Sequence, residues 1–417
     1  MRVSRPHRGG QDVLRDSRQD ALGLGLKGKF LNDTLQSAKL LDYLLALRDE
    51  MVASLRQLVE LESPSGNKLA LDCLGQHLAA EFAKLGGRIK LHKQRHAGDH
   101  LQVDFAGPGK PILILGHMDT VWDLGTLAAM PFRVAKGRAF GPGGFDMKAG
   151  IVQAIYAIRA LQERHARLPR AISVLLVSDE ESGSYSSRRI TERLAKRSAA
   201  VLVLEPAQGP KGALKTARKG VGAYRVAVEG QEAHSGLDAE KGASAVLELA
   251  RQLLVIEKFA DRRRGITVNP GVVRGGTRTN VIAGEAVAEV DARVTRLKDI
   301  AYLDKKFSSL KPFDKRCRIE ISGGISRPPM ERSRQTFALF TLARRLAHER
   351  GWKLEEASVG GGSDGNFTAA LGIPTLDGLG AVGEGAHARH ESVLITEMPR
   401  RAALLARLIE SIPIRSC

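Results

Sequence analysis

Several apolar runs in this sequence lead into side chains that can bind a divalent metal. Three runs and one Gly-rich segment are each followed closely by a potential ligand: His117 after residues 112–115, Asp146 after residues 141–145, Glu181 after residues 171–177, and Glu205 after residues 201–204. An apolar run bounded by loop residues is typical of a buried strand. Ligands of open α/β sheets gather outside the carboxyl ends of the strands, so one histidine and three carboxylates there predict a metal site.

A hydrolytic metal centre needs oxygen and imidazole ligands, an open position for water, and a base that takes a proton from that water. Glu180 and Glu181 suggest a division of labour, because adjacent side chains at a strand end cannot both face the same way. One can bind metal while the other stays free as a general base. Asp146 is the natural bridge between two metals, since it begins a helical pattern whose N-terminal dipole favours a carboxylate. Asp119 could accept the other imidazole N–H of His117 and fix its tautomer.

Each of these signals has an ordinary alternative when it is taken alone. The run Asp179-Glu180-Glu181 could be a solvated loop, and the pair His117 and Asp119 could make only a local hydrogen bond. Their joint occurrence at the ends of apolar strands favours the metal site.

The elements that would position these residues alternate between strand and helix. Amphipathic helices are predicted at residues 37–61 and 68–85, and further helices at residues 147–164 and 186–196 lie between the apolar strands. Alternation of this kind predicts a mixed, largely parallel sheet covered by helices, which is an α/β fold.

The pattern changes after about residue 218. Six elements follow in the order β-α-β-β-α-β, which is the ferredoxin-like arrangement: residues 222–229, 242–257, 266–273, 285–294, 299–310 and 318–322. The α/β pattern returns after Pro328-Pro329, with helices at residues 333–350 and 398–412. We therefore expect a catalytic domain at residues 31–217 and 331–417, interrupted by an inserted α+β domain at residues 218–330. Residues 1–30 are expected to be a flexible extension.

Composition narrows the class of protein further. The net charge is +18, but the basic residues are scattered and no nucleic-acid motif accompanies them, so we expect a solvated basic surface with neither nucleic acid nor membrane as partner. The basic N-terminus is followed by no apolar signal-peptide core, which makes the cytoplasm the expected location. The three cysteines, Cys73, Cys317 and Cys417, are too far apart to suggest a disulfide framework or a cysteine zinc site.

Four motifs together resemble one enzyme family in their order and spacing: Gly116-His117-Met118-Asp119-Thr120-Val121, Gly141-Pro142-Gly143-Gly144-Phe145-Asp146-Met147-Lys148, Ser178-Asp179-Glu180-Glu181-Ser182-Gly183-Ser184 and Leu204-Glu205-Pro206. This is the co-catalytic zinc family of aminoacylases, acetylornithine deacetylases, succinyl-diaminopimelate desuccinylases and bacterial glutamate carboxypeptidases. The resemblance runs from about residue 37 to the C-terminus. It implies a zinc-peptidase domain interrupted by a ferredoxin-like lid and dimerisation domain.

The resemblance also implies a role for each matching residue. His117 and Glu205 would hold one zinc ion, Glu181 and His387 the other, and Asp146 would bridge them. His390 is a nearby competitor for the last position, and the glycine context of Gly383-Glu384-Gly385-Ala386-His387 favours His387. Cobalt or manganese could replace zinc. Glu180 would be the general base, and the peptide bond after Asp146 is often cis in such proteins.

Further matches lie in the inserted domain and in a late Gly-rich loop. His234 would reach the active site of a partner subunit and stabilise the oxyanion, and Asn280 would polarise the substrate carbonyl. Arg293 matches a position that binds a substrate carboxylate, which suits a guanidinium. From the sequence alone, a surface turn residue is the more frequent case for a histidine such as His234, and Arg293 could equally be a strand-edge ion-pair partner. Gly361, within Gly360-Gly361-Gly362-Ser363-Asp364-Gly365, would lie close to the substrate.

The expected function is hydrolysis of an amide bond next to a free carboxylate. The segments His117-Met118-Asp119-Thr120-Val121-Trp122 and Met130-Pro131-Phe132 look most similar to the glutamate carboxypeptidase branch, so we expect release of a C-terminal amino acid from a peptide or N-acyl conjugate by a homodimer. One alternative is an N-acyl-amino-acid deacylase with the same chemistry. A second is a catalytically silent anion-binding protein on this fold, which would use its basic surface.

Overall fold

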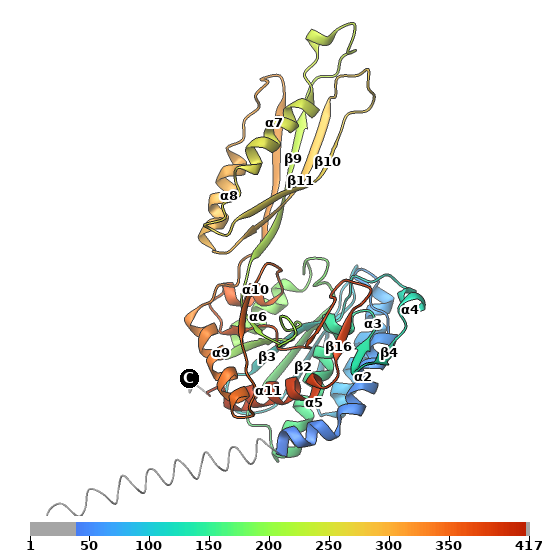
Figure 1. Ribbon diagram of the computed structural model, residues 1–417, viewed down its shortest axis with the longest axis vertical. Helices are drawn as coiled ribbons and strands as arrows, with labels where there is room; N and C mark the ends of the chain where they lie inside the picture. Colours follow the sequence, from blue (N-terminus) through green and yellow to red (C-terminus); the bar gives the residue numbers. More distant parts are fainter. Residues whose placement is uncertain (1–38, 414–417) are drawn as a thin grey trace, which may run out of the picture.

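The apolar runs of the sequence form the centre of a six-stranded sheet in the computed structural model, which describes residues 39–413 (Figure 1). Its strand order is β1-β2-β6-β3-β7-β14. The bounds are Arg88–His92 (β1), His100–Phe105 (β2), Ile112–His117 (β3), Ile172–Val177 (β6), Ala200–Val203 (β7) and Thr375–Leu376 (β14). The strands β6, β3, β7 and β14 run parallel to one another, whereas β2 is antiparallel to both of its neighbours, β1 and β6. The sheet is thus mixed and largely parallel, and the α/β prediction is confirmed.

Helices cover both faces of this sheet because alternate side chains of the central strands point to opposite sides. Ile112 and Ile114 of β3 belong to the larger core, which α2, α3, α5, α9 and α11 complete. Leu113 and Leu115 belong to a smaller core on the other face, under α6. The helix bounds are Arg48–Glu60 (α2), Lys68–Lys84 (α3), Ala149–Arg164 (α5), Arg188–Arg197 (α6), Arg334–His348 (α9), Gly365–Ala370 (α10) and Glu397–Ser411 (α11).

Smaller elements complete this large body. A four-stranded sheet has the order β15-β16-β5-β4, and β8 pairs with β13 in parallel. The bounds are Arg133–Ala135 (β4), Arg138–Phe140 (β5), Leu214–Arg218 (β8), Glu356–Val359 (β13), Gly383–Glu384 (β15), Ser392–Leu394 (β16) and the short helix Thr126–Ala129 (α4). The first of these sheets brings the segment around residue 140 next to the segment around residue 392.

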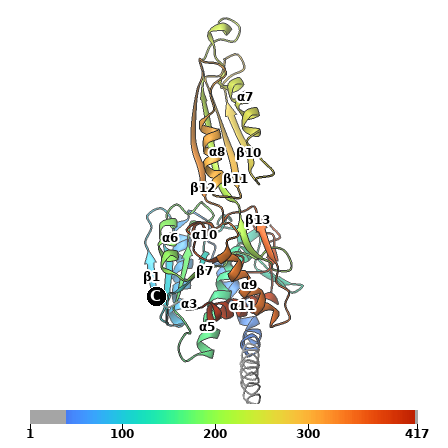
Figure 2. The same cartoon turned by 90° about the vertical axis from the view of Figure 1, so that its left-hand side faces the viewer.

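A second body, which we call the lid, projects from the large body (Figure 2). Its elements are Gly220–Glu229 (β9), Ala245–Glu257 (α7), Thr267–Gly275 (β10), Glu285–Val294 (β11), Lys298–Ser308 (α8) and Arg318–Arg327 (β12). The antiparallel strand order β10-β11-β9-β12 gives the lid a ferredoxin-like sheet, with its own core between the sheet and the two helices. The β-α-β-β-α-β order matches the one expected for the insertion.

The chain enters and leaves the lid through two adjacent segments, residues 218–219 and 327–330, which we call the linkers. Arg218 and Met330 bond to each other through both backbone N–H groups. The side-chain amide of Asn366 donates to the carbonyl oxygens of Lys219 and Pro328, one in each linker. The two linkers are therefore fastened to each other and to the start of α10.

Two helix predictions need correction. The helix predicted at residues 37–61 is interrupted at Leu47, and α2 begins at Arg48. The helix expected to begin at Asp146 starts three residues later, at Ala149. Asp146 and Met147 have non-helical backbone angles, and the dipole argument for Asp146 therefore does not hold.

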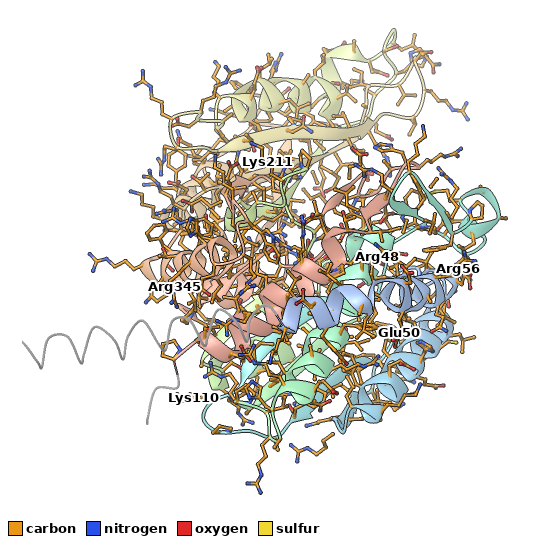
Figure 3. The ribbon with its side chains drawn as sticks, turned by 60° about the horizontal axis from the view of Figure 1, so that its bottom comes forward. Arg48, Glu50, Arg56, Lys110, Lys211 and Arg345 are labelled. Carbon is orange, nitrogen blue, oxygen red and sulfur yellow. The ribbon has the colours of Figure 1, made fainter. Side chains whose placement is uncertain are left out.

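Charged side chains cover the surface of the large body. Arg48, Glu50 and Arg56 lie on the exposed side of α2, and Lys110 and Arg345 project outward elsewhere (Figure 3). In residues 39–413, no helix has the length and apolar character needed to cross a membrane. The extension expected at residues 1–30 lies outside the described residues.

Candidate metal centre

Three parallel strands bring the candidate ligands to one edge of the large sheet. β3 lies between β6 and β7, and residue pairs such as His117 with Val177 place their carboxyl ends together. His117 is the last residue of β3, while Glu181 and Glu205 follow the ends of β6 and β7. Parallel pairing therefore explains why residues from distant parts of the sequence meet here.

The five predicted ligands form one cluster. His117 Nε2 lies 3.3 Å from Asp146 Oδ1 and 3.6 Å from Glu205 Oε1. His387 Nε2 lies 3.5 Å from Asp146 Oδ2 and 3.0 Å from Glu181 Oε1. Asp146 thus turns one carboxylate oxygen toward each histidine, and this is the arrangement that a bridging ligand needs. His387 is therefore the late histidine that belongs to the cluster, and in residues 39–413 no hydrogen bond or ion pair joins His390 to it.

The donor set fits one or more divalent cations. The ligand atoms of His117, Glu180 and Glu205 lie within 4.8 Å of one another, as do those of His117, Asp146 and Glu181. Asp146 Oδ1 is buried and accepts no hydrogen bond from the described residues, so it has an unused lone pair at the centre of the cluster. Imidazole nitrogen and carboxylate oxygen are ligands for zinc, and cobalt or manganese accept the same set.

The electrostatics of the cluster favour positive charge. Burial alone would lower the pKa of His117, but the contact with Asp146 and the charge of Asp119 raise it well above its ordinary value. Asp146 and Glu181 raise the pKa of His387 to about 10. Burial would raise the pKa of Asp146, but the two histidines lower it. A pocket that holds protons this strongly will also stabilise a cation.

Asp119 contacts both His117 and the loop that carries Glu180 and Glu181. His117 Nδ1 lies 2.9 Å from the backbone oxygen of Asp119, whereas the nearer carboxylate oxygen is 3.6 Å away. The carboxylate of Asp119 instead accepts the backbone N–H groups of Glu180 and Glu181, at 3.1 and 3.0 Å, and the hydroxyl of Ser65. Asp119 is therefore the partner of the other imidazole nitrogen, as expected, but through its backbone oxygen, while its carboxylate shapes the loop that carries the two glutamates.

Asp146 lies in a tight turn, Gly144–Lys148, whose Asp146–Met147 peptide bond is cis, as the resemblance implied. The backbone N–H groups of Phe145 and Asp146 donate to Oε1 of Glu391, at 2.9 and 3.0 Å. A buried carboxylate thus replaces the helix dipole as the feature that orients this segment.

Glu180 lies beside the ligands and pairs with an arginine from the lid linker. Arg327 Nη1 is 2.8 Å from Glu180 Oε1 and 2.9 Å from Asp364 Oδ1. Arg327 Nη2 also donates to the backbone oxygen of Glu180 and to the hydroxyl of Ser184. Burial raises the pKa of Glu180 well above its ordinary value, and Arg327 offsets only part of this. A raised pKa is what a carboxylate needs in order to act as a base near neutral pH.

A second linker arginine, Arg218, supports Glu205. Arg218 Nη2 donates to Glu205 Oε2 at 3.0 Å, and Arg218 makes a two-pronged contact with Asp377 at 2.8 and 2.9 Å. Its Nη1 donates to the carbonyl oxygens of Gly361 and Gly362, at 3.3 and 2.9 Å. Glu205, Asp377 and the Gly-rich loop are therefore held by one buried guanidinium.

The other predicted site residues, His234, Asn280 and Arg293, lie at opposite ends of the lid. His234 and Asn280 lie together, since Ser235 N donates to the Asn280 carbonyl and His234 pairs with Val281. His234 lies in the loop between β9 and α7 and Asn280 in the loop between β10 and β11, and both loops are at the end of the lid that is remote from the large body (Figure 1). Arg293 lies near the linkers, where it donates to the Gly360 carbonyl at 2.8 Å and pairs with Asp291 at 3.0 Å. The metal cluster of the same chain thus receives neither His234 nor Asn280.

Sequence reasoning missed the residues that support the ligands, namely Arg218, Arg327, Asp377 and Glu391. The available signals were weak: two arginines flank the inserted domain, and Glu391 follows His387 by four positions. None of these positions follows a long apolar run, so the strand-end argument could not find them.

The chain is similar to known proteins over most of its length. The family model described as peptidase family M20/M25/M40 matches residues 113–411. The chain is similar to carboxypeptidase G2 from Pseudomonas sp. (strain RS-16), with 30% identity over 86% of this chain and 88% of that protein. It is also similar to succinyl-diaminopimelate desuccinylase from Stenotrophomonas maltophilia (strain K279a), with 26% identity over 73% of this chain and 84% of that protein.

A solved structure shares the fold. The crystal structure of aminopeptidase PepT from Bacillus cereus ATCC 10987 superposes with a TM-score of 0.75 at 22% identity, over 88% of this chain and 98% of that chain. The likeness extends across both the large body and the lid, since so much of each chain is covered.

Proposed function

Because the chain belongs to peptidase family M20/M25/M40, we propose that it is a metal-dependent exopeptidase of the glutamate carboxypeptidase type, which hydrolyses an amide bond next to a free carboxylate. One observation carries the proposal. Five side chains from distant segments meet in a single cluster, in which Asp146 turns its two oxygens toward His117 and His387. A structural ion-pair network would have no need for this pattern of two imidazoles and three carboxylates.

In the proposed reaction the protein supplies positioning and proton transfer. His117, Asp146, Glu181, Glu205 and His387 would hold two divalent cations, which supply Lewis-acid polarisation of the scissile carbonyl and activation of the attacking water. Glu180 takes a proton from that water and later delivers it to the leaving amine. Arg327 holds the Glu180 carboxylate at 2.8 Å, so the base faces the cluster in one orientation.

The substrate carboxylate is assigned to Arg293. Its guanidinium lies beside the Gly-rich loop through the contact with Gly360, and about a third of its side chain is exposed. A guanidinium can bind a carboxylate with two parallel hydrogen bonds. Asp291 would have to give up part of its contact with Arg293 when the substrate binds.

The oxyanion contacts are assigned to a second copy of the chain. The loops that carry His234 and Asn280 lie at the remote end of the lid, and the neighbouring strand β10 is an edge strand with exposed apolar side chains. Leu247 and Leu254 of α7 and Val273 of β10 are 61%, 64% and 54% exposed. A homodimer formed through this face would cover them and present His234 and Asn280 to the partner's cluster.

A substrate panel with metal-loaded protein tests the function. We expect release of glutamate from N-aroyl-glutamate and from dipeptides that end in glutamate, measured as free amino acid, and none after treatment with a chelator. Turnover restricted to N-acetylated amino acids would contradict the exopeptidase assignment and favour the deacylase. A protein that binds metal but cleaves no amide would favour the silent anion-binding alternative.

The deacylase is kept as a second candidate because of one specific similarity. Succinyl-diaminopimelate desuccinylase matches 73% of the chain, and its name describes cleavage of an N-acyl group. Both reactions would use the same cluster and differ in which part of the substrate the lid binds.

A further inference from the structure

Glu391 is a fully buried carboxylate that accepts four N–H groups. Its exposed fraction is 0%. Oε1 accepts the backbone N–H groups of Phe145 and Asp146, at 2.9 and 3.0 Å. Oε2 accepts the backbone N–H of Gly143 and the indole N–H of Trp122, both at 2.9 Å. Four donors are what an ionised carboxylate needs when it is removed from water.

The donors belong to segments that also carry candidate ligands. Trp122 lies five residues after His117, and Gly143 and Phe145 precede Asp146. Glu391 itself follows His387 by four residues. One carboxylate therefore joins three ligand-bearing segments that are up to 269 positions apart in the sequence.

The short segment between His387 and Glu391 is itself a compact turn. Ala388 N donates to the Gly385 carbonyl at 2.9 Å, and Glu391 N donates to the Ala388 carbonyl at 2.9 Å. After the turn, β16 pairs with β5, which leads into the Asp146 segment. Movement of the Glu391 side chain would therefore shift the Asp146 segment relative to His387.

We propose that Glu391 is a positioning residue that sets the separation of Asp146 and His387 and thereby the metal affinity of the cluster. The proposal rests on the proposed function in one respect, which is that these two residues bind metal. Glu391 is not one of the five candidate ligands, and it acts through the backbone of the Asp146 segment. Supporting groups of this kind change metal affinity by about 10–100-fold when they are removed.

The Glu391→Gln variant tests the proposal with little change of shape. An amide presents one acceptor oxygen and one NH2 group, so two of the four N–H donors would face another donor. We expect zinc affinity, measured by competition with a chromogenic chelator, to fall about 10–100-fold. In metal-free protein, the backbone amides of Gly143, Phe145 and Asp146 should exchange with deuterium faster than in the wild type.

Two other variants make the result specific. Trp122→Phe removes one donor and leaves the three backbone bonds, so a smaller loss of zinc affinity is expected, and this variant also serves if Glu391→Gln does not fold. Glu397→Gln is the matched control, since the carboxylate of Glu397 lies on α11 and bonds to Arg400 at 2.8 Å. Its zinc affinity should equal that of the wild type.

The outcomes separate this proposal from the proposed function. If Glu391→Gln is less stable but the folded variant binds zinc as tightly as the wild type, Glu391 is only structural and the proposal is overturned. It is overturned as well if the wild type binds no zinc, cobalt or manganese. If the wild type binds metal but hydrolyses no amide, the proposed function fails, while the affinity and exchange measurements still decide the role of Glu391.

Discussion

Arg327, the last residue of β12, lies with its Nη1 2.8 Å from Oε1 of Glu180. The contact joins the lid linker to the carboxylate that we assign as the general base. The side chains of Arg327 and Glu180 are only 9% and 11% exposed, so the pair is shielded from solvent. The orientation of the base is therefore tied to the strand that ends the lid.

Replacing Arg327 by Met should impair turnover without removing the metal. The Glu180 carboxylate would lose its fixed orientation, and misplacement of a catalytic group by about 1 Å can cost on the order of 100-fold in rate. We expect kcat to fall by about 10–100-fold, with the zinc content unchanged by elemental analysis. Arg332→Met is the control, since Arg332 pairs with Glu356 at the surface. A variant with wild-type kcat would show that Arg327 does not position the base.

The Glu180→Gln variant tests whether Glu180 acts as the general base or as a metal ligand. The amide keeps the shape but cannot accept a proton, and general bases contribute about 100–10,000-fold to rate. We expect turnover to fall within that range while the protein retains its metal. Loss of metal together with activity would instead make Glu180 a ligand, as its proximity to His117 and Glu205 allows.

The strand-end ligands could be predicted from the sequence because they follow apolar runs that pair in parallel. His117 and Glu205 are in this class, and local pattern suffices to find them. Their supporting residues could not be predicted, because the contacts join unrelated parts of the chain: Arg327 and Glu180 are 147 positions apart, and Trp122 and Glu391 are 269 apart. Such contacts depend on how the lid linkers and loops pack, and no local periodicity encodes that.

The start of α5 illustrates the same limit in a single segment. The sequence after Asp146 has helical periodicity, which predicts a helix that begins at that residue. Hydrogen bonds to Glu391 and the demands of the turn Gly144–Lys148 instead hold Asp146 and Met147 out of helical geometry. A tertiary contact therefore overrides the local preference at the predicted bridging ligand.

Asp377→Asn should destabilise the large body. The Asp377 carboxylate is 0% exposed and accepts hydrogen bonds from Arg218 and from the Ser363 hydroxyl. Removing its charge leaves a buried guanidinium less well compensated, which typically costs about 3–5 kcal/mol in the free energy of unfolding. Urea denaturation of metal-free protein measures this cost.

The matched control is an exposed ion pair in the lid. Arg225 and Glu289 lie 3.8 Å apart with side chains about half exposed, so Glu289→Gln should cost less than about 1 kcal/mol. If Asp377→Asn and Glu289→Gln lower the free energy of unfolding by the same amount, the buried contact with Arg218 does not stabilise the protein more than an exposed ion pair does.

Asp99 should make the stability of the protein depend on pH in the acid range. Burial alone would raise the pKa of Asp99, but Lys93, the Gln94 N–H and Lys68 lower it to about 2. A carboxylate with a lowered pKa stabilises the folded state above the unfolded pKa of about 4, and this stabilisation is lost as the pH falls toward 2.

The Asp99→Asn variant checks this expectation. Relative to the wild type, it should lose about 2 kcal/mol in the free energy of unfolding at pH 7, and the difference should shrink between pH 4 and pH 2. Urea titrations of metal-free protein at several pH values supply the measurement, because metal release would otherwise add its own pH dependence. A difference that stays constant down to pH 3 would contradict the assigned ion pairs with Lys68 and Lys93.

His234 should act across a dimer interface. Its loop lies at the end of the lid remote from the metal cluster of its own chain, beside Asn280.

In a mixture of His234→Ala and Glu180→Gln subunits, each mixed dimer would contain one site with an intact Glu180 and an intact His234 from the partner. Random exchange in a two-fold dimer then predicts about one quarter of wild-type activity, although each variant alone is nearly inactive. Activity is measured before and after subunit exchange at constant protein concentration. If the mixture stays as inactive as its components although exchange has occurred, His234 serves its own chain or takes no part in the reaction.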